Sequence, residues 1–238
     1  YNAINPSTGE VIEEQIADTW GYTLNGYYAV YLIDGTERYK NAVLEALENI
    51  HHYKNYPWEG KSADGYADAI ESALNLYNRI PSDPVADWID SETKVMWNKQ
   101  QESGIIEGWH GDGNFARTTI MYCLWKTQGL TIDPWREDVI FGAIIRDDQL
   151  IFVIQSEKPW KGKILFDQER HKKVLNMPLD YPRINQFPEW FTVLESNSYR
   201  LNGLNNKISE EYEPQDLING LEMEIDQDKT YVFELFID

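Results

Sequence analysis

The stretch that decides the fold is Asp64-Gly-Tyr-Ala-Asp-Ala-Ile-Glu-Ser-Ala-Leu-Asn-Leu-Tyr77. Its apolar residues recur at the spacing of an α-helix. Two further stretches, Asp18 to Tyr31 and Asp112 to Trp125, can be laid over it, because each opens with an acidic residue, has an aromatic residue within four positions and closes on a bulky pair. The copies begin at residues 18, 64 and 112, so the repeat is 46 and then 48 residues long. That is the length of two helices with their connections.

The repeat predicts two kinds of helix in alternation. Apolar residues surround the stretches Thr19–Ile33, Ala63–Tyr77 and Phe115–Gln128, as is typical of helices enclosed by others. Between them, Glu37–Ile50 and Val85–Gln101 have a single apolar stripe and are expected to be outer helices. We therefore expect α/α-hairpins that form part of a toroid, with parallel inner helices whose N-terminal ends gather on one rim.

After Pro134-Trp135 the hydrophobic period shortens from 3.6 toward 2, which indicates strands. Short β-type runs separated by turn residues predict an antiparallel β-sandwich. The overall expectation is an α+β protein, with an α/α-hairpin, toroid-like domain over residues 1–136 and the sandwich over residues 137–238. The expected strands are Val139–Ile145, Leu150–Gln155, Lys163–Phe166, Phe191–Leu194, Tyr199–Leu201, Leu221–Ile225 and Thr230–Ile237.

Composition narrows the classes of partner. The formal charge of −19 over 238 residues, with no basic cluster, argues against nucleic acid. No apolar run reaches the ~18 residues of a membrane span. The 9 Trp and 15 Tyr suit surfaces that stack on sugars as well as an ordinary core. Cys123 is expected to be a buried thiol, and the start at Tyr1 is expected to be internal or processed.

The densest group of chemically active residues lies between Glu107 and Arg117, where three glycines allow tight turns. His110 is a candidate general base or acid, and Tyr122 a second group for proton transfer. Asn114 and Arg117 are candidates to neutralise a carboxylate or an enolate-like anion. The structural alternative is a loop in which Asp112 caps the following helix and His110 bonds a backbone carbonyl.

A second candidate is an acidic stripe along the helix Ala63–Tyr77. Positions 64, 68, 71, 75 and 78 fall on one helical face, which places Asp64, Asp68 and Glu71 in line. Paired carboxylates can serve acid/base glycoside hydrolysis, whereas a solvated face is the structural alternative. On an inner helix such a stripe is expected to border a cavity or cleft. Trp20, Tyr22 and Asn25 occupy the corresponding part of the first repeat, with core packing as their alternative.

The layout resembles that of polysaccharide lyases of the heparinase and hyaluronate-lyase type, in which an α/α-toroid precedes a β-sandwich. Asp112-Gly113-Asn114-Phe115 is similar to their Asp-Gly-Ser-aromatic segment, although Arg117 stands where their catalytic His follows and His110 precedes the motif. The resemblance implies β-elimination on a uronate-containing glycan. In that chemistry Tyr or His removes the proton α to the carboxylate, and Asn, Arg or His neutralises it.

Three hypotheses follow. In the leading one, His110 and Tyr122 transfer protons, Asn114 and Arg117 neutralise the carboxylate, and the sugar platform consists of Trp20, Tyr22, Tyr66 and Trp109. The first alternative is a toroid glycoside hydrolase that uses Asp64, Asp68, Glu71 or Asp112 as acid and base. The second is a non-catalytic glycan-binding or scaffold module. No metal or cofactor is expected, the partner is a polysaccharide or oligosaccharide, and a periplasmic or secreted location follows if the glycan hypothesis holds.

Overall fold

The computed structural model describes residues 3–107, 113–178 and 186–237. It confirms the predicted α+β class, with helices between residues 20 and 126 and antiparallel sheets between 131 and 237. The chain divides into two compact units, Tyr1–Tyr122 with Asp180–Pro188, and Cys123–Leu179 with Glu189–Asp238. The first is the helical unit and the second the β unit, and each is described by itself.

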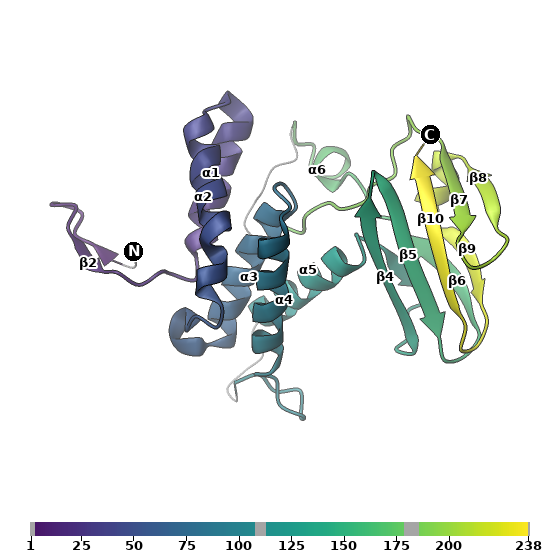
Figure 1. The fold of residues 1–238 in the computed structure, drawn as a ribbon, viewed down its shortest axis with the longest axis horizontal. Helices are drawn as coiled ribbons and strands as arrows, with labels where there is room; N and C mark the ends of the chain where they lie inside the picture. The colour runs from purple at the N-terminus through teal and green to yellow at the C-terminus, as the bar shows by residue number, and fades with distance from the viewer. Residues whose placement is uncertain (1–2, 108–112, 179–185, 238) are drawn as a thin grey trace. The chain divides into compact units, whose positions relative to one another are not determined.

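The helical unit begins with a small hairpin of two short strands and continues as helices (Figure 1). Short turns reverse the chain between the first and second α-helices and again between the third and fourth. The elements are β1 (Ala3–Ile4), β2 (Val11–Glu13), α1 (Trp20–Asp34), α2 (Glu37–Asn49), η1 (Ile50–Tyr53), η2 (Trp58–Lys61), α3 (Ala63–Tyr77), α4 (Asp83–Trp97) and α5 (Gly113–Lys126), the last of which ends in the β unit.

Helices α1, α3 and α5 form a row and run in the same direction. Gly21 of α1 lies against Ser72 of α3, so closely that a Cβ at residue 21 would lie 2.1 Å from the Ser72 Cβ. The Thr118 hydroxyl of α5 donates to the Ala67 carbonyl of α3 (3.0 Å). Between α3 and α5, Asp64 contacts Asn114 and Asp68 contacts Arg117, so the partner moves along α5 as the residue moves along α3. Between α1 and α3, Asp18, which comes just before α1, interacts with Asp64 and Tyr22 with Asp68, in the same order along both segments. Contacts in this order indicate helices that run in the same direction. The predicted parallel arrangement of the inner helices is confirmed.

Among the helices of the described residues, α3 alone is enclosed on all sides, so the prediction of three enclosed helices was wrong for α1 and α5. In α3, 13 of 15 residues are buried, because α1 and α5 flank it and α4 packs on it. In α1 only Gly21, Asn25 and Tyr28 are buried, and Ile33 is 72% exposed. Cys123 of α5 is also exposed, contrary to the prediction, because it points away from the buried Met121 and Trp125.

The outer helices have the predicted amphipathic character. Helix α2 buries Val43 and Leu47, and α4 buries Trp88 and Met96 among others. The N-cap of α3 is Ser62, whose hydroxyl accepts from the Gly65 N–H (2.9 Å). Asp64 is therefore left to contact a neighbouring helix.

The β unit holds two antiparallel sheets that lie face to face (Figure 1) and share one hydrophobic core. The larger sheet has the order β4-β5-β10-β7-β8, and the smaller β3-β6-β9. Phe152 and Phe233, from neighbouring strands of the larger sheet, stack in the shared core with ring centroids 5.1 Å apart. The elements are β3 (Thr131–Asp133), β4 (Val139–Arg146), β5 (Gln149–Ser156), β6 (Trp160–Leu165), α6 (Arg170–Lys173), β7 (Tyr199–Gly203), β8 (Ser209–Tyr212), α7 (Pro214–Ile218), β9 (Leu221–Ile225) and β10 (Thr230–Ile237).

In the β unit, two strands were missed and one was predicted in error; the short strands β1 and β2 of the helical unit were not predicted either. The segment Phe191–Leu194 buries Phe191 and Val193 in alternation, which produced the strand prediction. Its strand-like pairing among the described residues is limited to an isolated bridge between Thr192 and Asp167. Strand β3 was missed because it is short. Strand β8, with the sequence Ser-Glu-Glu-Tyr, was missed because it is polar and lies at the sheet edge.

Candidate functional site

The side chains of three helices meet in a cluster of polar and charged groups in the helical unit. The amide nitrogen of Asn114, on α5, donates to Asp64 and to Asp68 (3.2 Å), both on α3. Arg117, one turn further along α5, contacts Asp68 (3.2 Å) and Glu71 through the same nitrogen, Nη2. The structure thus brings together residues from both predicted candidates, the glycine-rich segment and the acidic stripe. We call Tyr22, Asp64, Asp68, Glu71, Asn114 and Arg117 the carboxylate cluster.

Exposure falls along the stripe from the rim inward. Asp64, in the first turn of α3, is partly exposed, the Asp68 side chain is 12% exposed, and Glu71 is completely buried. Side chains of α1 and α5 contact the deeper part of the stripe, at Asp68 and Glu71. The cavity or cleft expected beside the stripe stays a prediction, because residues 108–112, which precede α5, lie outside the described residues. The pKa of Asp68 is raised to about 6, first by burial and also by the charges of Asp64 and Glu71, although the Tyr22 hydroxyl and the charge of Arg117 act to lower it.

Tyr22 reaches the cluster from α1. Its hydroxyl donates to Glu71 Oε2 (3.3 Å) and lies close enough to Asp68 to affect its pKa. Burial, followed by the charge of Glu71, raises the pKa of Tyr22 itself. Tyr22 is therefore a hydrogen-bond donor to carboxylates and not a ready proton acceptor.

Asp18 lies near the same rim and was not predicted as a site residue. Its pKa is raised, first by burial and then by the charges of Glu59 and Asp64, although the Thr19 N–H opposes the shift. The available signal was its position, since Asp18 opens the first copy of the repeat as Asp64 opens the second.

Glu107 and Asn114, which lie on either side of residues 108–112 in the glycine-rich segment, both form hydrogen bonds with the first turn of α3. Glu107 accepts from the Ala63 N–H (2.5 Å), and Asn114 contacts Asp64. Glu107 was not predicted to have this role. Trp109, His110 and Asp112, three of the predicted site residues, lie outside the described residues, and their roles remain predictions.

The remaining predicted site residues are not part of the cluster. Tyr66 is 2% exposed, with the Lys99 ammonium 5.2 Å from its ring centroid. The Tyr122 hydroxyl donates to Asp90 (2.8 Å). Asn25 is 2% exposed, and neither polar atom of its amide has a hydrogen-bond partner among the described residues.

Trp20 lines a separate, largely apolar pocket of about 340 Å³. Its ring meets Trp88 edge to face, with centroids 6.5 Å apart, and Trp58 also meets Trp88 edge to face, with centroids 6.2 Å apart. The pocket shares no lining residue with the carboxylate cluster, and its lining residues are Ile16, Trp20, Leu24, Ala42, Glu45, Ala46, Asn49, Ile50, Tyr53 and Trp58.

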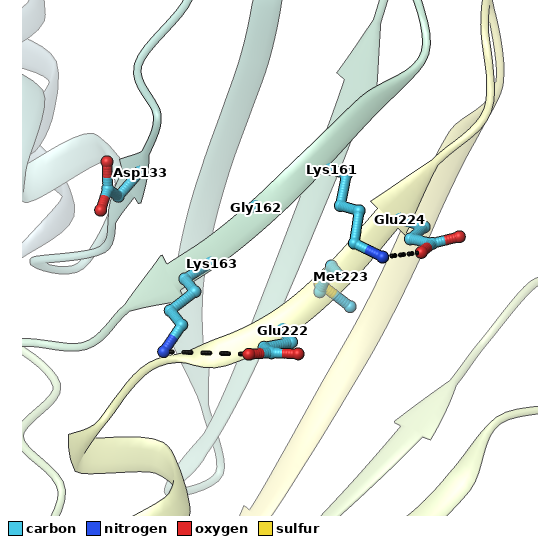
Figure 2. Close-up of a pocket in the computed structure, with 7 residues that line it drawn as sticks. All are labelled: Asp133, Lys161, Gly162, Lys163, Glu222, Met223 and Glu224. Carbon is cyan, nitrogen blue, oxygen red and sulfur yellow. Dashed lines mark hydrogen bonds and ion pairs between the residues drawn. The ribbon is translucent and has the colours of Figure 1, made fainter.

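The β unit has a hollow of about 410 Å³ on the smaller sheet. Figure 2 shows Lys161 and Lys163 of β6 paired with Glu224 and Glu222 of β9 across the strands. All four side chains are at least 41% exposed, and exposed pairs of this kind contribute little energy. A solvated sheet surface accounts for the hollow, and the carboxylate cluster is the stronger candidate.

Two further observations concern metal ions and membranes. Within residues 3–107, 113–178 and 186–237, no three His, Cys, Asp or Glu side chains come together in a group that could hold a metal ion. No helix in the same ranges combines the length and apolar character needed to cross a membrane.

Comparisons of the chain with protein-family models, with curated proteins and with solved structures gave no match. The chemistry of the carboxylate cluster is therefore the basis of the functional proposal.

Proposed function

We propose that this protein degrades a polysaccharide by hydrolysing glycosidic bonds, with Asp68 as the proton donor and Asp64 as its carboxylate partner. The observation that carries the proposal is the placement of two carboxyl groups in different environments beside one shared amide, that of Asn114. Glycosidases require such a pair, one member protonated and one ionised.

The environments support this division of roles. Asp64 lies in the first turn of α3, where the helix dipole favours a negative charge. Asp68 lies one turn deeper, and burial raises its pKa to about 6, so that it holds a proton in weakly acidic solution. Burial therefore favours the protonated form of Asp68, which is the form that a proton donor needs.

The spacing supports retention of configuration. One nitrogen donates to both carboxyl groups, so their oxygens are closer than the ~6.5–9.5 Å typical of inverting enzymes and nearer the ~5–5.5 Å of retaining ones. Asp64 would then act as the nucleophile.

The geometry gives less support to β-elimination. The two groups assigned to neutralise a substrate carboxylate, Asn114 and Arg117, contact carboxylates of the protein itself. Tyr122, assigned to proton transfer, donates to Asp90. Since His110 lies outside the described residues, elimination stays a prediction, and the assay below tests it directly.

The experiment is turnover of a panel of neutral and uronate polysaccharides, followed by release of reducing ends and by ultraviolet absorbance of unsaturated uronates. We expect reducing ends without absorbance, and a product whose first-formed anomer, observed by NMR, retains configuration. Asp68→Asn and Asp64→Asn should each reduce turnover by at least ~100-fold. Asp87→Asn, on the exposed side of α4, is the matched control and should leave turnover unchanged.

Three results would contradict the proposal. Absorbance of an unsaturated uronate would show elimination, glycan binding without any product would show a binding module, and full activity of Asp68→Asn would move the acid elsewhere.

A further inference from the structure

Glu71 is the innermost member of the carboxylate cluster, and its environment differs from that of Asp68. Its side chain is completely buried, and its Oε2 atom accepts from both Arg117 and the Tyr22 hydroxyl. These donors come from α5 and α1, so three helices meet at one carboxylate oxygen. The Asp68 side chain is 12% exposed and receives Arg117 and Asn114 at 3.2 Å each, and the Tyr22 hydroxyl also acts to lower its pKa.

One guanidinium is shared between two carboxylates. Arg117 contacts Glu71 more closely than it contacts Asp68, and with the same nitrogen. When two carboxyl groups compete for a single positive charge, the group with the stronger donors stays ionised and the other takes up a proton more readily. The contacts therefore favour a charged Glu71 and a protonated Asp68.

We propose that Glu71 is a positioning residue that retains its charge by holding Arg117 and Tyr22, and thereby assigns the exchangeable proton of the cluster to Asp68. The assignment of the proton stands on the geometry of the cluster alone. Its consequence for turnover rests on the proposed function, in which Asp68 is the acid.

The groups that act on Asp68 come from each inner helix. They are Tyr22 from α1, Asp64 and Glu71 from α3, and Arg117 from α5. The carboxyl group that α4 buries against α3 is Glu92, which acts on Tyr66 instead. Glu92 is as fully buried as Glu71 and provides a matched control for the loss of one buried charge.

The test is titration of the side-chain carboxyl carbons by NMR, with Asp68→Asn used to assign the Asp68 signal. In the wild-type chain, Asp68 should take up its proton at a higher pH than Glu71. In Glu71→Gln, the loss of a neighbouring negative charge and the release of Arg117 should move the Asp68 midpoint downward by about one pH unit or more. Glu92→Gln should leave this midpoint in place, and Glu71→Asp should largely restore it.

An unchanged Asp68 midpoint in Glu71→Gln would overturn the inference. So would a wild-type titration in which Glu71 protonates before Asp68, and this measurement needs no variant that must fold. If hydrolysis is found, activity should fall as Asp68 loses its proton, so the basic limb of the pH profile should move with the Asp68 midpoint. A midpoint that moves in a chain that hydrolyses no glycan would leave the inference standing and refute the proposed function.

Discussion

The contact between Gly21 and Ser72 tests the central packing of the helical unit. A Cβ at residue 21 would lie 2.1 Å from the Ser72 Cβ and 2.7 Å from its hydroxyl, far inside normal contact. Ser72 is completely buried and its Cβ is fixed to the α3 backbone, so α1 and α3 must separate before an alanine fits at residue 21. Overpacking of this kind costs roughly 1–3 kcal/mol and occasionally more.

Gly26 supplies the control for Gly21→Ala. Both glycines lie in α1, but nothing lies within 4 Å of a Cβ built at Gly26. Alanine should stabilise a helix interior by about 1 kcal/mol relative to glycine, so Gly26→Ala should raise the free energy of unfolding by that amount. At Gly21 the same gain is set against a clash near the upper end of the overpacking range. We therefore expect Gly21→Ala to be less stable than Gly26→Ala by about 3 kcal/mol.

The assay is urea-induced unfolding followed by far-ultraviolet circular dichroism, which mainly reports the helices. Ser72→Gly removes the obstructing Cβ, so the double variant Gly21→Ala/Ser72→Gly should recover about 2 kcal/mol relative to the sum of the single effects. Equal stability of Gly21→Ala and Gly26→Ala, or a coupling near zero, would refute the close approach of α1 and α3 on which the carboxylate cluster depends.

Two further predictions concern charges in the cluster. Arg117→Met should lower the free energy of unfolding at pH 8 by about 3 kcal/mol in urea titrations, because it leaves the carboxylate of Glu71 buried without its cation. Lys40, which is 35% exposed and pairs with Glu37, supplies the control: Lys40→Met should cost less than ~0.5 kcal/mol, and equal effects of the two substitutions would contradict the prediction. For Asp68, whose pKa is raised from 3.8 to about 6, the folded state binds the proton more tightly, so the contribution to stability is full below pH 4 and is lost as pH rises through 6. The difference in unfolding free energy between the wild type and Asp68→Asn should therefore fall by about 1 kcal/mol from pH 4 to pH 7.5, after allowance for solvent screening. A rise over this range would show that folding lowers the pKa of Asp68 and would contradict the prediction.

Much of the helical unit was predictable because its signals are local. The 46 to 48 residue spacing and the apolar faces placed each helix close to its observed bounds and indicated the parallel row. The enclosure of α1 was not predictable in the same way. An apolar circumference shows what a helix can bury, whereas the neighbours actually present decide what it does bury. Among the described residues, α1 packs on α2 and α3, whereas α3 has α1, α4 and α5 around it.

The strands show a related limit. Alternating burial is the signal for a strand, and Phe191–Leu194 has that alternation without a neighbouring strand to pair with. In β8 the pairing exists without the alternation, because an edge strand with polar side chains has little to bury. Hydrogen-bond pairing between distant segments is decided by the tertiary fold, and single-sequence periodicity does not contain it.

The sequence predicted two separate candidate sites, and the structure brings residues of both together in the carboxylate cluster. The stripe of Asp64, Asp68 and Glu71 could be read from the helical period, since that period is local to α3. Nothing in the sequence showed that Asn114 and Arg117 would face it, because this depends on the rotation of α5 about its axis and on its displacement along α3. That relation also changes the chemistry. Groups expected to neutralise a substrate carboxylate are placed on the protein's own carboxylates, so the cluster is better suited to donating a proton than to stabilising an anion of the substrate.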